Sequence, residues 1–250
     1  MDLGLVVVIA AGAALAGFVQ GLTGFGFSMV SLAVWAWMLD PALAAVLSVF
    51  GGWTGQVIAA VTVRRGFDLK LLLPFAVGGA LGVPVGATIL PLLDVSTFKV
   101  MLGLLLVIWC PIMIFSTRLP HIRRGGRVAD GVIGLIGGVM GGLGGFSGVV
   151  PTLWCTLRGM SKDSQRVLVQ NLNLLLLSLT LTAYLSSGLM TREVLPALAV
   201  VVPAMLIPAL LGARLYTGIS DQAFKRLVLG MLTAAGIAML AAGLPVLLGR

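Results

Sequence analysis

Two glycine clusters interrupt long apolar stretches of this sequence and carry the residue types best suited to binding chemistry. The first runs Gly21-Leu-Thr-Gly-Phe-Gly26 and the second Gly141-Gly-Leu-Gly-Gly-Phe-Ser-Gly148. Glycine lets the backbone approach a ligand closely, and N–H groups at a helix start hold anions. No Lys, Arg or His lies in the apolar stretches, so an anion there needs backbone dipoles, hydroxyls or amides. The candidate binding residues in and beside the clusters are Gly21, Thr23, Gly24, Gly26, Ser28, Gly144, Gly145, Ser147, Gly148 and Thr152.

Four amide side chains, Gln56, Gln170, Asn171 and Asn173, are the strongest polar groups within the apolar stretches. An amide offers two N–H donors, which suits an oxyanion. Asn171 and Asn173 lie about 200° apart on a helix, so at most one of them faces a common site. Gln56 and Asn171 complete the candidate set. For the amides the alternative is an interhelical hydrogen bond, and for the glycines it is close helix packing.

One short motif could indicate an enzyme. The sequence Gly145-Phe-Ser-Gly148 fits the G-x-S-G pattern of rhomboid-type intramembrane serine proteases. Such a serine needs an activating base. The only histidine, His121, lies in a basic segment away from the apolar stretches, and Cys110 and Cys155 form no spaced set. We therefore expect no catalytic residue, no metal site and no cofactor.

The composition indicates a membrane protein. Hydrophobic residues make up 59% of the 250 residues and charged residues only 10%. Eight charge-free stretches of at least 18 residues follow one another, and about 20 helical residues cross a bilayer. The net charge of +8 comes from short segments between these stretches, which membrane topology explains. The expected partners are therefore the lipid bilayer and a small anion, with no nucleic acid.

The chain has two similar halves. Gly17, Gly21 and Gly24 recur as Gly137, Gly141 and Gly144, at an offset of 120, and further ordered pairs end at an offset of 126. We divide the chain into a first membrane repeat over 1–117, a cytoplasmic linker over 118–130 and a second repeat over 131–250.

The distribution of Lys and Arg predicts the topology. If the first apolar stretch of each half is a hairpin, these residues divide 13 to 3 between the two sides, and the basic side is cytoplasmic. This arrangement inverts the second half relative to the first, a common plan of secondary transporters. The predicted fold is an all-α polytopic membrane protein of two inverted repeats. Each repeat is a glycine-tipped hairpin, re-entrant or spanning, followed by three transmembrane helices, and the two glycine tips approach one another.

On its glycine clusters and their placement at the start of both halves, the chain resembles the TauE/SafE family. The resemblance implies a permease of the bacterial inner membrane that moves sulfite, sulfonates or related small anions, with export as the expected direction. Uptake of a sulfur-containing or carboxylate anion is the alternative. A membrane assembly subunit is an alternative of another class. The apolar stretches lack Asp, Glu and His, so we expect no proton relay through a buried side chain.

The topology prediction places both termini, Asp40 and Asp94 outside the cytoplasm, and the segments around Arg64 and over 118–127 inside it. Single cysteines at positions 40 and 66 should react with an impermeant thiol reagent from opposite sides of a sealed membrane. Labelling of both positions from the same side would refute the assignment.

Overall fold

A computed structural model describes residues 2–24, 26–62, 66–115, 122, 125–215 and 221–249 of the chain. The first half contains α1 (Leu3–Thr23), α2 (Phe27–Trp35), α3 (Pro41–Thr62), α4 (Leu69–Ile89), the 3₁₀ turn η1 (Leu90–Leu92) and α5 (Val95–Ile114). The second half contains α6 (Arg127–Gly144), α7 (Val149–Leu157), α8 (Lys162–Ser186), η3 (Arg192–Val194), α9 (Leu195–Leu215) and α10 (Asp221–Leu247). Phe25, the Arg64 and Arg65 loop, His121 and most of the predicted linker lie outside the described residues.

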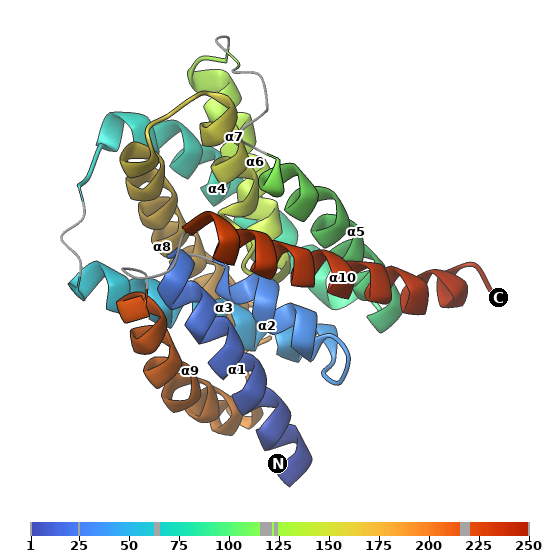
Figure 1. The fold of residues 1–250 in the computed structure, drawn as a ribbon. Coiled ribbons are helices and arrows are strands. Elements are labelled where there is room, and N and C mark those ends of the chain that lie inside the picture. Colours follow the sequence, from blue (N-terminus) through green and yellow to red (C-terminus); the bar gives the residue numbers. More distant parts are fainter. Residues whose placement is uncertain are drawn as a thin grey trace.

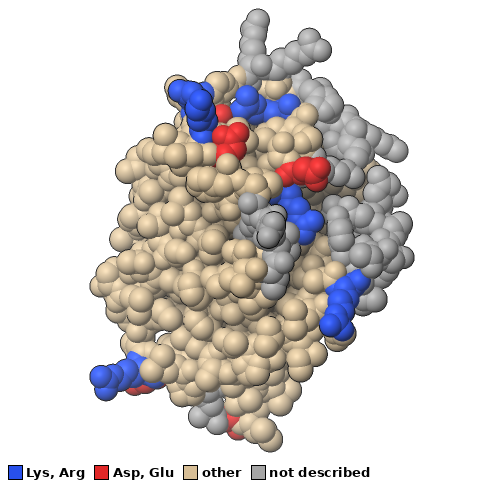
Figure 2. Space-filling model, turned by 90° about the vertical axis from the view of Figure 1, so that its left-hand side faces the viewer, with Lys and Arg blue, Asp and Glu red and all other residues tan. Residues whose placement is uncertain are grey.

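The all-α membrane class is confirmed. The described residues contain 8 helices that are long and apolar enough to cross a bilayer. Helices α2 and α7 have only 9 residues each, about 13 Å, less than half of a hydrocarbon core. Charged side chains gather toward the upper and lower ends of the face in Figure 2, with a broad uncharged surface between them on the left. The chain is therefore a multi-pass membrane protein with one half-length helix in each half.

The same series of helices, one long, one short and three long, occurs in both halves. The second series begins at Arg127, so the last four residues of the predicted 118–130 linker are helical. One of them, Asp130, is buried and bonds to Arg158 and Trp154, at 2.8 Å in each case. This ion pair fastens the C-terminal end of α7 to the start of α6.

The packing of glycines gives the relative directions of the helices. Gly78, Gly82 and Gly86 of α4 meet Gly131, Leu135 and Val139 of α6 in the same order, so these helices run parallel. Helices α1 and α9 also run parallel, because Gly17 faces Met205 and Gly21 faces Ala209.

The equivalent helices of the two halves run antiparallel. In α5 and α10, which lie side by side in Figure 1, Gly236 faces Gly103 and Gly243 faces Val100. Trp53 of α3 donates to Ser178 of α8, and Asn171 of α8 donates to the carbonyl of Gly66, which follows the end of α3. Inverted halves would produce this arrangement, and the inverted repeat itself stays a prediction.

The close packing of α4 on α6 generates a stability prediction. A Cβ placed on Gly82 would lie 2.2 Å from the Leu135 carbonyl oxygen, whereas one on Gly230 of α10 would meet nothing within 4 Å. Gly82→Ala should cost about 1–3 kcal/mol or more because backbone cannot yield as a side-chain tip does. Melting curves of the purified protein should show a lower transition for Gly82→Ala. The matched control, Gly230→Ala, should melt at or above the parent temperature, since Ala favours helix. Equal melting of the two variants would contradict the packing.

Candidate functional site

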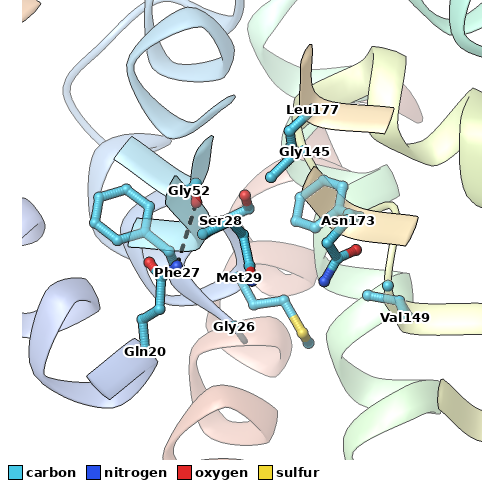
Figure 3. A pocket seen from close by; sticks show the side chains of 13 residues that line it. Gln20, Gly26, Phe27, Ser28, Met29, Gly52, Gly145, Val149, Asn173 and Leu177 are labelled. Atoms are coloured by element: carbon cyan, nitrogen blue, oxygen red, sulfur yellow. Dashed lines mark hydrogen bonds between the residues drawn. The ribbon is translucent and has the colours of Figure 1, made fainter. Parts of the chain in front are cut away.

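The breaks after α1 and α6 meet at a cavity of about 30 Å³. That volume holds about one or two water molecules. In Figure 3, Asn173 lies across the cavity from Gln20 and Phe27, with Ser28 and Met29 between them. The described residues that line it are all uncharged: Gln20, Gly26, Phe27, Ser28, Met29, Gly52, Gln56, Gly145, Phe146, Gly148, Val149, Asn173 and Leu177. Segments from both halves therefore form one site, as the sequence predicted for the glycine tips.

Both short helices start at the cavity, and neither start is capped by a side chain. Helix α2 follows Gly26, which has φ 97°, and α7 follows Gly148. Within the described residues, the N–H groups of Phe27, Ser28 and Met29 donate no hydrogen bond, and neither do those of Gly148 and Val150. The first turn of a helix leaves such donors open, and its dipole is positive there. The cavity thus lies between two sets of free backbone donors.

The carbonyl ends of the preceding helices are covered instead. At the end of α6, Tyr184 donates to Gly142 O at 2.7 Å, and Ser48 donates to Gly144 O at 3.1 Å. At the end of α1, Gln56 donates to Gly24 O at 3.1 Å. Because these acceptors are occupied and the N–H groups are open, the breaks present a positive local field to the cavity.

Asn173 supplies a side-chain donor to the same space. The Ser147 hydroxyl donates to Asn173 Oδ1 at 2.9 Å, while Asn173 Nδ2 makes no hydrogen bond within the described residues. Asn173 is 94% buried. Ser147 is therefore a positioning residue, which turns the amide nitrogen of Asn173 toward the cavity.

Asn171, a predicted site residue, does not line this cavity. Its amide donates to the Gly66 carbonyl at 3.1 Å, on the connection between α3 and α4. The expected angle of about 200° between positions 171 and 173 holds, so one residue faces the cavity and the other faces away from it.

Of the predicted residues, Gly26, Ser28, Gln56, Gly145 and Gly148 line the cavity. Gly145 takes φ 85°, and a Cβ placed there would lie 2.5 Å from Ser28 Oγ, so the two breaks touch at this point. Gly148 leaves room for Asn173, whose Nδ2 would lie 2.7 Å from an added Cβ. Gly145 therefore allows the two breaks to approach each other closely, and Gly148 allows Asn173 to approach the second break.

The other predicted residues do not line the cavity. Gly21 packs on the Ala209 carbonyl of α9, and Gly144 packs on Leu32. Gly24 takes φ 76° and donates its N–H to Gln20 O. Gly21 and Gly144 therefore serve helix packing, and Gly24 forms a turn.

Two hydroxyls also lie away from the cavity lining. Thr23 donates to Val19 O at 2.9 Å within its own helix. Thr152 is buried in α7, and its hydroxyl oxygen has no hydrogen-bond partner among the described residues.

Gln20 is a lining residue that the sequence analysis did not select. It is 94% buried, and its amide donates to Gly52 O at 3.2 Å. The criterion that selected Gln56, an amide within an apolar stretch, applies equally to Gln20. Gly52 also lines the cavity. The sequence could not predict this, because nothing distinguishes Gly52 from the other glycines of the helices.

One family model, described as Sulfite exporter TauE/SafE, matches residues 9–239 of the 250-residue chain. The chain belongs to the TauE/SafE family. No curated protein and no solved structure matches it significantly. The family consists of permeases, so this member is a membrane transporter of the sulfite or anion exporter type and not an enzyme. The bonding of Ser147 agrees, because its hydroxyl donates to an amide oxygen, which is no general base.

The two asparagines of α8 provide a matched test of the site. Asn173→Asp keeps the shape of the side chain but places a carboxylate beside the bound anion. Two like charges about 4 Å apart repel by about 4 kcal/mol at an effective dielectric constant of about 20. Sulfite binding, measured by calorimetry on purified protein, should therefore be lost. Asn173→Ala should weaken binding about tenfold, since one charge-assisted donor is removed.

Asn171→Asp is the control, because it introduces the same charge on the same helix outside the cavity. It should bind sulfite as the parent does. Equal loss of affinity in both Asp variants, or retained binding in Asn173→Asp with an unchanged melting temperature, would exclude Asn173 from the site.

Proposed function

We infer that the protein exports small oxyanions, sulfite first among them, across the bacterial inner membrane by binding them between the N-termini of α2 and α7. The observation that carries this proposal is the cavity between two uncapped half-helix starts. Backbone N–H groups at helix starts bind anions without any charged side chain.

The pattern of free and occupied polar groups favours an anion over a cation. A cation site in a broken helix uses unwound carbonyl oxygens. Here the carbonyls at Gly24, Gly142 and Gly144 already accept hydrogen bonds from side chains. The N–H groups at the two helix starts and Asn173 Nδ2 are open donors among the described residues, beside one buried unpaired acceptor, Gln20 Oε1. These donors outnumber that side-chain oxygen, which favours an oxyanion over a sodium ion.

The size of the cavity supports the smallest substrates of the class. The cavity has room for about one or two water molecules, and Phe27, Phe146 and Leu177 border it. Modest movement of Met29, a flexible side chain at the cavity, would make room for sulfite or a methyl sulfonate. A larger organic anion would need the two short helices to separate.

The direction of transport follows from the electrical driving force. None of the described residues that line the cavity titrates in the physiological range, so the anion moves with its own charge. A membrane potential contributes about 2.3 kcal/mol per charge per 100 mV, and a cell negative inside drives anions outward. Export with both termini in the periplasm is therefore proposed; uptake would need another source of energy.

A membrane assembly subunit remains the alternative of another class. An assembly role needs no polar cavity, yet buried, unpaired donors cost free energy unless a ligand uses them. The cavity therefore favours transport.

Flux measurements test the proposal directly. Protein reconstituted into liposomes should move sulfite when a potassium diffusion potential is imposed at the same pH on both sides. The accumulation ratio of a monovalent sulfonate should change by about 50-fold per 100 mV.

Two controls make the flux result specific. Asn173→Asp should remove the flux, and Asn171→Asp should retain it. A strict requirement for a pH gradient, with a sulfonate that stays ionised over the tested range, would contradict potential-driven movement. Flux that is equal for small cations and anions would contradict the anion site.

A further inference from the structure

One face of α8 carries a polar track from the protein surface to the cavity. Arg166, Gln170, Asn173 and Leu177 follow one another at spacings of four, three and four residues, which places them on one side of a helix. Asn173 and Leu177 line the cavity, and Arg166 is exposed. Seven residues separate Arg166 from Asn173, a rise of about 10 Å.

Gln170 lies between these two levels and has no partner of its own. It is 94% buried, and its amide makes no hydrogen bond in the part of the chain that the structure describes. The amide atoms are not among the fully enclosed unpaired atoms of the described residues, so they keep some access to open space. An arrangement of this kind is expected where a polar ligand visits the side chain.

The turn at Gly24 brings Arg166 and Gln170 together. A Cβ placed on Gly24 would lie 2.8 Å from Gln170 Nε2 and 3.8 Å from both Nε and Nη2 of Arg166. On its other side the same turn is bonded to Gln56, which lines the cavity. Among the described residues, the Gly24 turn therefore has Arg166 and Gln170 on one side and the cavity-lining Gln56 on the other.

We propose that Arg166 and Gln170 form a second oxyanion-binding station, through which the anion reaches the central cavity from the surface at the N-terminal end of α8. The guanidinium attracts the anion and can bind an oxyanion in bidentate fashion. The Gln170 amide then receives it, about one helical turn above Asn173. This station deepens the proposed function and rests on it, because it assigns the side from which that cavity is loaded.

The equivalent positions on α3 carry no such track. At the offset of 122 between the halves, they are Ala44, Ser48 and Gly51. Ser48 is fully buried and donates to Gly144 O, and the other two are apolar. Of these two equivalent helices, only α8 carries the polar series, and the distribution of Lys and Arg assigns its N-terminal end to the cytoplasm. Loading from there suits an exporter.

Thiol labelling at position 170 tests the station without any transport measurement. Gln170→Cys should react with impermeant methanethiosulfonates only from the face that carries Arg158 and Arg166, in sealed vesicles of known orientation. The anionic sulfonatoethyl reagent should react faster than the cationic trimethylammonioethyl reagent, after correction for their rates with a free thiol. Methanesulfonate should slow the reaction; sulfite is unsuitable here because it cleaves disulfides. The parent protein, whose Cys110 and Cys155 are buried, gives the background.

Charge variants identify the contribution of Arg166. Arg166→Gln in the Gln170→Cys protein should lower the ratio of anionic to cationic rates by about threefold or more, as expected for the loss of one nearby charge. Lys70→Gln removes an exposed charge at the start of α4, on the same predicted side, and should leave the ratio unchanged. Equal rates for the two reagents, or equal effects of the two variants, would overturn the station.

A second measurement covers the case in which Gln170→Cys does not fold. Arg166→Gln alone, at an exposed position, should raise the apparent KM for anion on that side several-fold and leave the maximal flux unchanged. An unchanged KM would overturn the station. Labelling from the opposite face with intact flux would refute the station and leave the proposed function standing. The predicted labelling without anion flux would refute the proposed function instead.

Discussion

The whole arrangement depends on one constraint, the need to pair every backbone polar group inside a hydrocarbon core. A helix that breaks within the membrane exposes carbonyls at its end and N–H groups at the next start. This protein breaks two helices and treats the two kinds of group differently. Side chains of Tyr184, Ser48 and Gln56 cover carbonyls at the breaks, while the starts of α2 and α7 stay open toward the cavity. In the function we propose, an anion uses these open donors when it binds, so the energetic cost of the break becomes part of the transport mechanism.

Close glycine packing brings the two breaks together. Backbone approaches as near as those of Gly82 to Leu135 and Gly21 to Ala209 allow no side chain between the helices. In a bilayer, such contacts replace the hydrophobic effect as the source of helix association. Because α4 binds α6 and α1 binds α9, each half is held mainly by the other half. The cavity between the halves is thus fixed by the same contacts that stabilise the fold.

The two short helices are anchored differently at their ends away from the cavity. In α2, Trp35 donates to a backbone carbonyl, that of Val8 in α1. In α7, Trp154 donates to Asp130, which also pairs with Arg158. The buried carboxylate therefore has two structural partners, both at the C-terminal part of α7, and it does not line the cavity. This agrees with an anion that moves under the membrane potential instead of a proton relay.

The sequence by itself determined the membrane class, the series of spans, the two glycine breaks and the family. Each of these depends on composition, length or local spacing, which tertiary contacts do not change. Only the tertiary structure decided which glycines and amides line the cavity. In the sequence, Gly21, Gly144 and Gly145 are all glycines of the two clusters and cannot be told apart. In the structure, Gly21 and Gly144 pack on other helices, whereas Gly145 contacts Ser28 at the cavity. Helical periodicity fixed the angle between Asn171 and Asn173 and left open which of them points inward, because that depends on how α8 is rotated against α4, α3 and α7.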